Sequence, residues 1–158
     1  MIEFNRLTEI DKSEIIELMN NLLVRRQMPL LKGVFGDKDC DEFIAAKERL
    51  WIDNGYGPWA FVVNGQFVGW GGLQPEHGEA DLGMVLHPKY WGIGKTLYGE
   101  IIDRAFGEMG FETITVLLPP TRKRMKGLLR LGFKREGELM IGEERFIRYR
   151  LDKREAKG

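Results

Sequence analysis

The segment between residues 82 and 109 constrains the fold of this chain more than any other. An apolar run ends at Pro88, and two glycines, Gly92 and Gly94, follow it. After them, apolar residues recur with the period of a helix, at Leu97, Ile101, Ala105 and Met109. A strand, a glycine-containing loop and a helix start bring free backbone N–H groups and the positive end of the helix dipole together. The sequence therefore predicts a site for a phosphate-bearing ligand.

Two common phosphate loops do not fit this segment. A P-loop requires a glycine five residues before its Gly-Lys-Thr, and that position is Lys89. A dinucleotide fingerprint requires a third glycine at position 97, which is Leu97. What remains is a backbone that can approach a phosphate closely, because glycine has no Cβ, with Lys95 adding a cation at the first turn of the helix.

The segment resembles the GNAT acetyltransferases, and more particularly the branch similar to ribosomal-protein-alanine acetyltransferases. Those relatives carry Pro-x-Tyr-Trp-Gly and then Gln/Arg-x-x-Gly-x-Gly/Ala, which opens a helix over the pyrophosphate of acetyl-CoA. Lys89 stands where Gln or Arg is usual, and a second register beginning at Trp91 also fits. The resemblance implies that acetyl-CoA is the acyl donor and that its phosphates bind at Lys89, Trp91, Gly92, Ile93, Gly94, Lys95 and Thr96.

A second segment carries the same resemblance. Relatives have Asn-x-x-Ser before a helix that ends in Leu-Gly-Phe, and residues 131–133 read Leu-Gly-Phe here, with Gly132 as a helix C-cap. Thr121 and Arg124 replace the Asn and Ser, and Leu128 stands where other branches place a tyrosine that protonates the departing thiolate. Arg122 and Arg124 are expected to contact the 3′-phosphate of coenzyme A, although cations near a helix start are often only solvated.

Composition restricts the class of protein. The chain has 158 residues with 43% hydrophobic and 30% charged residues, which predicts one folded domain over residues 1–158. It has no apolar run of membrane-spanning length, and its one cysteine, Cys40, excludes an internal disulfide. We therefore expect a cytoplasmic protein without membrane partners. The basic run after Pro120 lacks interleaved aromatic residues, which argues against nucleic acid binding.

The hydrophobic pattern predicts the order β-α-α-β-β-β-α-β-α-β, an α/β fold with a mixed, mostly antiparallel central sheet flanked by helices. We expect strands at 2–7, 59–63, 66–73, 79–87, 113–118 and 145–151. Asn64-Gly65 marks a hairpin turn. Helices are expected from about Asp11 to Leu23, from about Asp39 to Asn54, after Gly94 and over 122–131.

Acyl transfer to an amine requires a neutral, aligned amine and stabilisation of the developing oxyanion. In GNAT proteins, as the resemblance implies, the strand before the glycine loop diverges from its neighbour and binds the thioester arm with backbone N–H groups, here those of Met84, Val85 and Leu86. Asp81 and Glu79 share one strand face and are the candidate proton acceptors, Asp81 at the position where relatives carry an acid. Either could instead be a solvated or ion-paired acid, and the two histidines and one cysteine show no metal-ligand spacing.

The sequence thus favours an acetyl-CoA-dependent N-acetyltransferase working by direct attack in a ternary complex. The acceptor is a small-molecule or protein N-terminal amine, and a dimer is compatible with the sequence. A non-catalytic acyl-CoA-binding or regulatory domain is the main alternative, because Arg124 and Leu128 depart from the family pattern.

Overall fold

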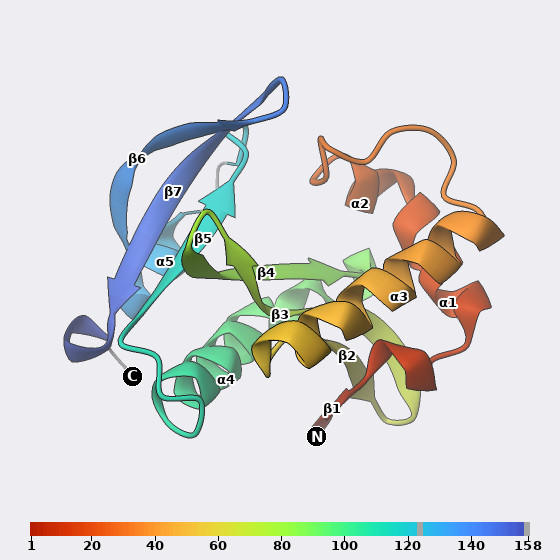
Figure 1. Ribbon diagram of the computed structural model, residues 1–158, viewed down its shortest axis with the longest axis horizontal. Coiled ribbons are helices and arrows are strands. Elements are labelled where there is room, and N and C mark those ends of the chain that lie inside the picture. The colour runs from red at the N-terminus through yellow and green to blue at the C-terminus, as the bar shows by residue number, and fades with distance from the viewer. Residues whose placement is uncertain (123–124, 157–158) are drawn as a thin grey trace. The chain divides into compact units, whose positions relative to one another are not determined.

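The computed structural model describes residues 1–122 and 125–156 (Figure 1). Its helices and strands, in chain order, are β1 (Ile2–Asn5), α1 (Lys12–Asn20), α2 (Leu22–Arg25), α3 (Asp37–Asn54), β2 (Pro58–Val63), β3 (Gln66–Glu76), β4 (Glu79–Leu86), α4 (Gly94–Phe106), β5 (Thr113–Leu118), α5 (Lys126–Leu131), β6 (Lys134–Ile141) and β7 (Glu144–Asp152). Three short 3₁₀ helices, Leu7–Glu9, Pro88–Ile93 and Lys153–Glu155, complete the elements.

The strands form a seven-stranded sheet in the order β1-β2-β3-β4-β5-β7-β6. The β1–β2, β2–β3, β5–β7 and β6–β7 pairs are antiparallel, whereas β4 and β5 are parallel. The predicted fold class is therefore confirmed. The sequence predicted six strands and missed β6, Lys134–Ile141. Charged residues interrupt the apolar alternation of this segment, so its pattern does not indicate a strand that pairs with β7.

The chain divides into two compact units. The first comprises Met1–Gln74 and Met84–Gly92, and the second comprises Pro75–Gly83 and Ile93–Gly158. Strands β3 and β4 each contribute residues to both units, so the chain passes between the units inside regular strands.

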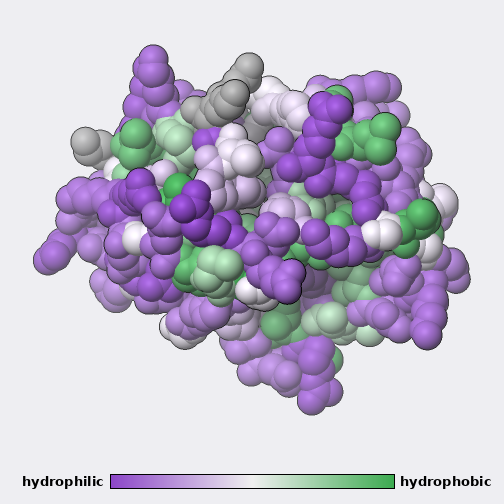
Figure 2. Space-filling view, turned by 90° about the horizontal axis from the view of Figure 1, so that it is seen from above, coloured by the Kyte–Doolittle hydropathy of each residue, from purple (hydrophilic) through white to green (hydrophobic). Residues whose placement is uncertain are grey.

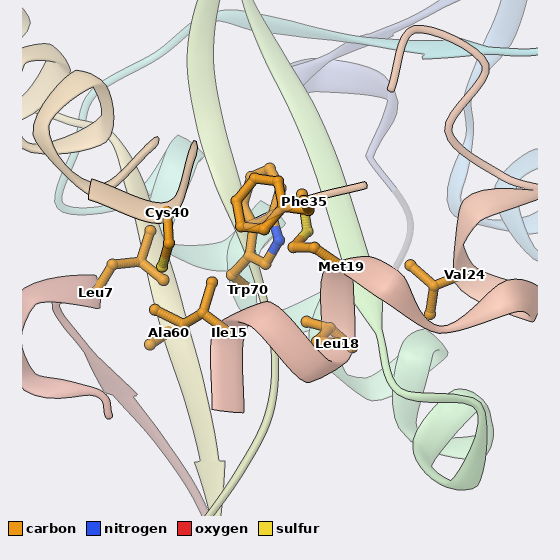
Figure 3. Close-up of a cluster of buried hydrophobic side chains, with 9 residues drawn as sticks. All are labelled: Leu7, Ile15, Leu18, Met19, Val24, Phe35, Cys40, Ala60 and Trp70. Carbon is orange, nitrogen blue, oxygen red and sulfur yellow. The ribbon is translucent and has the colours of Figure 1, made fainter. Parts of the chain in front are cut away.

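In the first unit, α1 and α3 bury their apolar sides against β2 and β3 (Figure 3). The cluster consists of Leu7, Ile15, Leu18, Met19, Val24, Phe35, Cys40, Ala60 and Trp70. The first helix was predicted to run unbroken to Leu23, but Asn21 has an extended backbone and its side chain caps α2 by accepting from Leu23 and Val24 N–H. Asn64 and Gly65 both have positive φ, as the predicted hairpin turn requires.

In the second unit, α4 buries one face, with Leu97, Ile101 and Ala105 fully inaccessible. Helix α5 begins at Lys126, four residues later than predicted, and Gly132 ends it in the left-handed conformation, as predicted. A Cβ on Gly132 would lie 2.6 Å from the carbonyl oxygen of Glu155, so this position requires glycine for space as well as for conformation. Strands β6 and β7 form a hairpin along one edge of the sheet (Figure 1).

Hydrophilic residues predominate on the face seen in Figure 2, with hydrophobic residues in small separate groups. Across residues 1–122 and 125–156, no helix combines the length and the apolar character needed to span a membrane.

Candidate active site

Strand β4 carries five of the predicted site residues: the two candidate acids and the three residues expected to donate backbone N–H groups. It pairs in parallel with β5 through Asp81 and Thr115, and among the described residues this is the one pair of that ladder. A regular parallel ladder would continue along both strands. Strands β4 and β5 therefore share a single point of register, after which β4 continues for five residues to Leu86.

In the first unit, the end of β4 is held tightly against β3. A Cβ built on Gly69 would lie only 2.2 Å from the carbonyl oxygen of Val85, so the two backbones approach more closely than any other residue allows. The N–H of His87 donates to the carbonyl of Val68 at 2.9 Å. The indole Nε1 of Trp91 donates to the carbonyl of Leu86 at 2.9 Å, which ties the following turn back to the strand.

The segment predicted as an open glycine loop is instead a 3₁₀ helix, Pro88–Ile93, that leads directly into α4. That prediction was wrong because Gly92 and Gly94 were taken as loop formers, whereas neither has a positive φ. His87 has a structural role here, since its ring Nδ1 accepts from the N–H of Lys89 at 3.2 Å. In a 3₁₀ helix each N–H bonds three residues back, so fewer amides are free than a loop would offer.

The start of α4 nevertheless offers an open backbone. Its N-cap residue is Ile93, which supplies no side-chain hydrogen bond to the first-turn amides. A Cβ built on Gly92 would meet nothing within 4 Å, and Gly92, Lys95 and Thr96 are exposed. Free first-turn N–H groups, the helix dipole and a lysine together suit an anionic group.

The second unit holds the two candidate acids in different surroundings. The carboxylate of Asp81 accepts a 2.7 Å hydrogen bond from the hydroxyl of Thr115, which is itself 1% exposed. Burial raises the pKa of Asp81 to about 7. The Thr115 hydrogen bond and the charge of Arg148 lower this pKa, whereas the negative charge of Glu76 raises it. A carboxyl group with a pKa near neutrality can take up a proton at physiological pH.

Glu79 is instead fixed as an anion. Its two carboxylate oxygens accept from the guanidinium of Arg150 at 2.6 and 3.1 Å, in a pair whose side chains are about three-quarters buried. The hydrogen bonds from Arg150 hold the pKa of Glu79 below its ordinary value. Glu79 therefore suits a proton acceptor less well than Asp81 does.

Sequence reasoning did not find the residues that surround these acids: Thr115, Arg148 and Arg150, together with Glu136, which binds both arginines. Arg150 also donates to Glu136 at 2.9 Å and to the hydroxyl of Thr113 at 3.2 Å, and Arg148 donates to Glu136 at 3.0 Å. The spacing of Arg148 and Arg150, two apart in a strand, was the available signal, since it predicts two cations on one sheet face.

The remaining candidates fall into three groups. Arg122 is half-buried in the turn after β5, with its N–H bonded to the carbonyl of Pro119, and Arg124 lies outside the described residues. Leu128 is 3% exposed on α5, so this buried position carries no hydroxyl. His77 has a positive φ beside Gly78 and lies in the turn between β3 and β4.

Comparison with known proteins gives the family. The family described as "Acetyltransferase (GNAT) domain" matches residues 2–134. The chain belongs to this family. Several solved GNAT structures share its fold at low sequence identity.

An acetyltransferase of the GNAT family from Bacillus anthracis has 20% identity and a TM-score of 0.77, covering 98% of this chain and 96% of that one. The aminoglycoside acetyltransferase AAC(6′)-Ib in complex with coenzyme A has 15% identity, a TM-score of 0.75 and the same two coverages, 98% and 96%. A putative ribosomal-protein-serine acetyltransferase from Vibrio cholerae has 18% identity and a TM-score of 0.72, covering 96% and 93%. At these identities the structures establish the shared GNAT fold.

Proposed function

We propose that the whole chain, residues 1–158, is one N-acetyltransferase domain that transfers the acetyl group of acetyl-CoA to a primary amine by direct attack in a ternary complex. The observation that carries this proposal is the buried carboxylate of Asp81, whose pKa of about 7 suits proton transfer. It lies on the strand that leads, through Pro88–Ile93, to the open start of α4.

Backbone groups supply the proposed donor site. The diphosphate of acetyl-CoA is bound by the first-turn amides of α4, with Lys95 as the nearby cation, and Gly92 leaves room for it. Because the β4–β5 ladder contains one described pair, the amides of Met84, Val85 and Leu86 are the proposed donors to the pantetheine arm and the thioester carbonyl. Lys89, Trp91, Ile93 and Thr96 complete this proposed surface, and Arg122 and Arg124 are proposed for the 3′-phosphate.

Asp81 supplies the proposed proton acceptor. The amine must be neutral to attack the thioester carbon, and its nitrogen loses one further proton as the amide forms. The new C–N bond forms, the C–S bond breaks, the coenzyme A thiolate leaves and the amine proton passes to Asp81. The thiolate is a tolerable leaving group because a thiol pKa lies near ~8.5, so the apolar Leu128 does not prevent the reaction.

The test combines binding with turnover. Calorimetry with acetyl-CoA, coenzyme A and ATP should give binding of the two thiol carriers and no magnesium-dependent ATP binding. Thiol release over a panel of amines, with the acetylated product identified by mass spectrometry, should then exceed the rate without amine. ATP binding without coenzyme A binding would refute the proposal. Tight coenzyme A binding without turnover of any amine would favour the non-catalytic alternative.

The membership of the branch similar to ribosomal-protein acetyltransferases stays part of this proposal, and it predicts that protein N-terminal amines are among the acceptors. A peptide beginning with the N-terminal residues of a ribosomal protein tests it, beside free amines in the same panel. If only the free amines are acetylated and the peptide is not, the assignment to that branch is contradicted.

A further inference from the structure

Two arginines on one face of β7 differ in how many of their donors are occupied. All three nitrogens of the Arg150 guanidinium donate, Nε to Glu136, Nη1 to Glu79 and Thr113, and Nη2 to Glu79. Arg148 donates through Nε alone, to Glu136 at 3.0 Å. Its Nη1 and Nη2 groups make no hydrogen bond or ion pair within residues 1–122 and 125–156.

The fold holds Arg148 in place by a bulge in the neighbouring strand. The β6–β7 register shifts between Arg135 and Gly137, so Glu136 is an extra residue of β6. A bulge re-aims the side chain of the extra residue, and here the two carboxylate oxygens of Glu136 accept from the two arginines. A guanidinium fixed through Nε presents its two Nη groups as a fork, which is the geometry that binds a carboxylate.

The register locates this fork relative to the proposed base. Asp81 pairs with Thr115 on β5, Thr115 pairs with Arg150 on β7, and Leu117 pairs with Arg148. Directly paired side chains lie on the same sheet face, and so do residues two apart in one strand. Asp81 and Arg148 therefore share a face, two strand spacings apart, which is about 10 Å between backbones. Arg148 lies two residues from Arg150 along β7, displaced in the direction in which β4 runs from Asp81 to Gly83.

The charge of Arg148 does not favour a polycationic acceptor. A guanidinium with unoccupied donors on the face of Asp81 repels a second positive charge. It lowers the pKa of a nearby amine as well, which favours the neutral nucleophile.

We infer that the Nη groups of Arg148 bind a carboxylate of the acceptor, so that among small amines this site prefers those that also carry a carboxylate, such as amino acids. Arg148 is then a specificity-determining residue. The inference rests on the proposed function for its catalytic consequence, whereas binding of the carboxylate depends only on this face of the sheet.

The experiment compares matched acceptors that differ only in the carboxylate: an amino acid, its amide and its decarboxylated amine. For the wild-type protein we expect kcat/KM to be about tenfold or more higher for the amino acid, because a charge-assisted hydrogen bond has about that effect. In Arg148→Gln the ratio should fall to about one through KM, and Arg148→Lys should restore part of it. Arg145→Gln is the control, because Arg145 is paired with Glu138 and lies on the opposite face of β7 by alternation. It should keep the wild-type ratio.

A binding measurement separates this inference from the proposed function. The coenzyme A-loaded protein is titrated with the N-acetyl amino acid and with the N-acetylated decarboxylated amine, for wild type and Arg148→Gln. Selective binding of the carboxylate by wild type, lost in the variant, supports the inference even if no amine is turned over. Equal or no binding of the two compounds overturns it. A higher wild-type kcat/KM for polyamines than for amino acids would also overturn it. An equal loss of kcat/KM for all acceptors in Arg148→Gln would show a purely structural role for Arg148 and would overturn it as well.

Discussion

Under the proposed function, the two ends of β4 act through different groups: side chains at one end and backbone amides at the other. Around Glu79 and Asp81 the side chains matter: one carboxylate is held by Arg150, and the other is buried beside Thr115. From Met84 to Leu86 the backbone matters, and a neighbouring glycine, Gly69, allows the strand its close approach to β3. Substitutions of Glu79 and Asp81 should therefore change kcat and its pH dependence. Substitutions near Met84–Leu86 should change stability and coenzyme A binding by moving the backbone of β4.

The largest effect is expected at Asp81. Under the proposed function, Asp81→Asn should lower kcat by about 10²- to 10⁴-fold, the usual contribution of a general base, with the affinity for acetyl-CoA unchanged. Wild-type kcat/KM should rise with pH through about 7, where Asp81 loses its proton, and the variant should lack this step. The measurement is thiol release against pH. Glu79→Gln is the matched control and should keep the pH step; if both variants retain it, Asp81 is not the base.

The same substitution should stabilise the fold at neutral pH. The pKa of Asp81 is raised from 3.8 in the unfolded chain to about 7 in the folded protein, so the folded state binds more protons. This group therefore lowers the free energy of unfolding as pH rises from about 4 to about 7, by an amount on the order of 4 kcal/mol as an upper bound. Urea unfolding should show Asp81→Asn more stable than wild type at about pH 8, with the difference shrinking toward about pH 4.5. A difference independent of pH would contradict the burial of an ionisable carboxyl group.

At the other end of β4, Gly69→Ala should cost about 1–3 kcal/mol of folding free energy, because the added methyl group collides with the carbonyl oxygen of Val85. It should also weaken coenzyme A binding by displacing the backbone of β4. Gly99→Ala on α4 is the control: a Cβ there meets nothing within 4 Å, and alanine favours a helix more than glycine does. Equal stability of the two variants would show that β3 and β4 are free to separate.

The smallest effect is expected at Lys95. Lys95→Gln should raise the KM for acetyl-CoA by only a few-fold, about the effect of one exposed charge at a helix start, and the difference should shrink at high salt. Lys38→Gln is closely matched, because Lys38 is also the second residue of its helix and is exposed. A change of kcat in Lys95→Gln, or an equal KM change in both variants, would argue against a phosphate site at the start of α4.

Much of this organisation follows from local sequence signals. The Asn64-Gly65 turn, the Gly132 cap and the apolar period of α4 were predictable because each is set by residues close together in the chain. The strand Lys134–Ile141 was not, since its pattern is broken by Glu136 and its stability comes from pairing with β7. The Asp81–Thr115 and Glu79–Arg150 contacts join residues 34 and 71 positions apart, and one sequence contains no direct signal for such pairs.

The bulge at Glu136 has a consequence for how acceptor preference can evolve. Deleting that one residue from β6 would restore a regular register and remove the shared anchor of both arginines, without altering a single residue of β4. Under the proposed function and the proposed role of Arg148, a change in the length of an edge strand would alter which amines are recognised while the sequence of β4 stays the same.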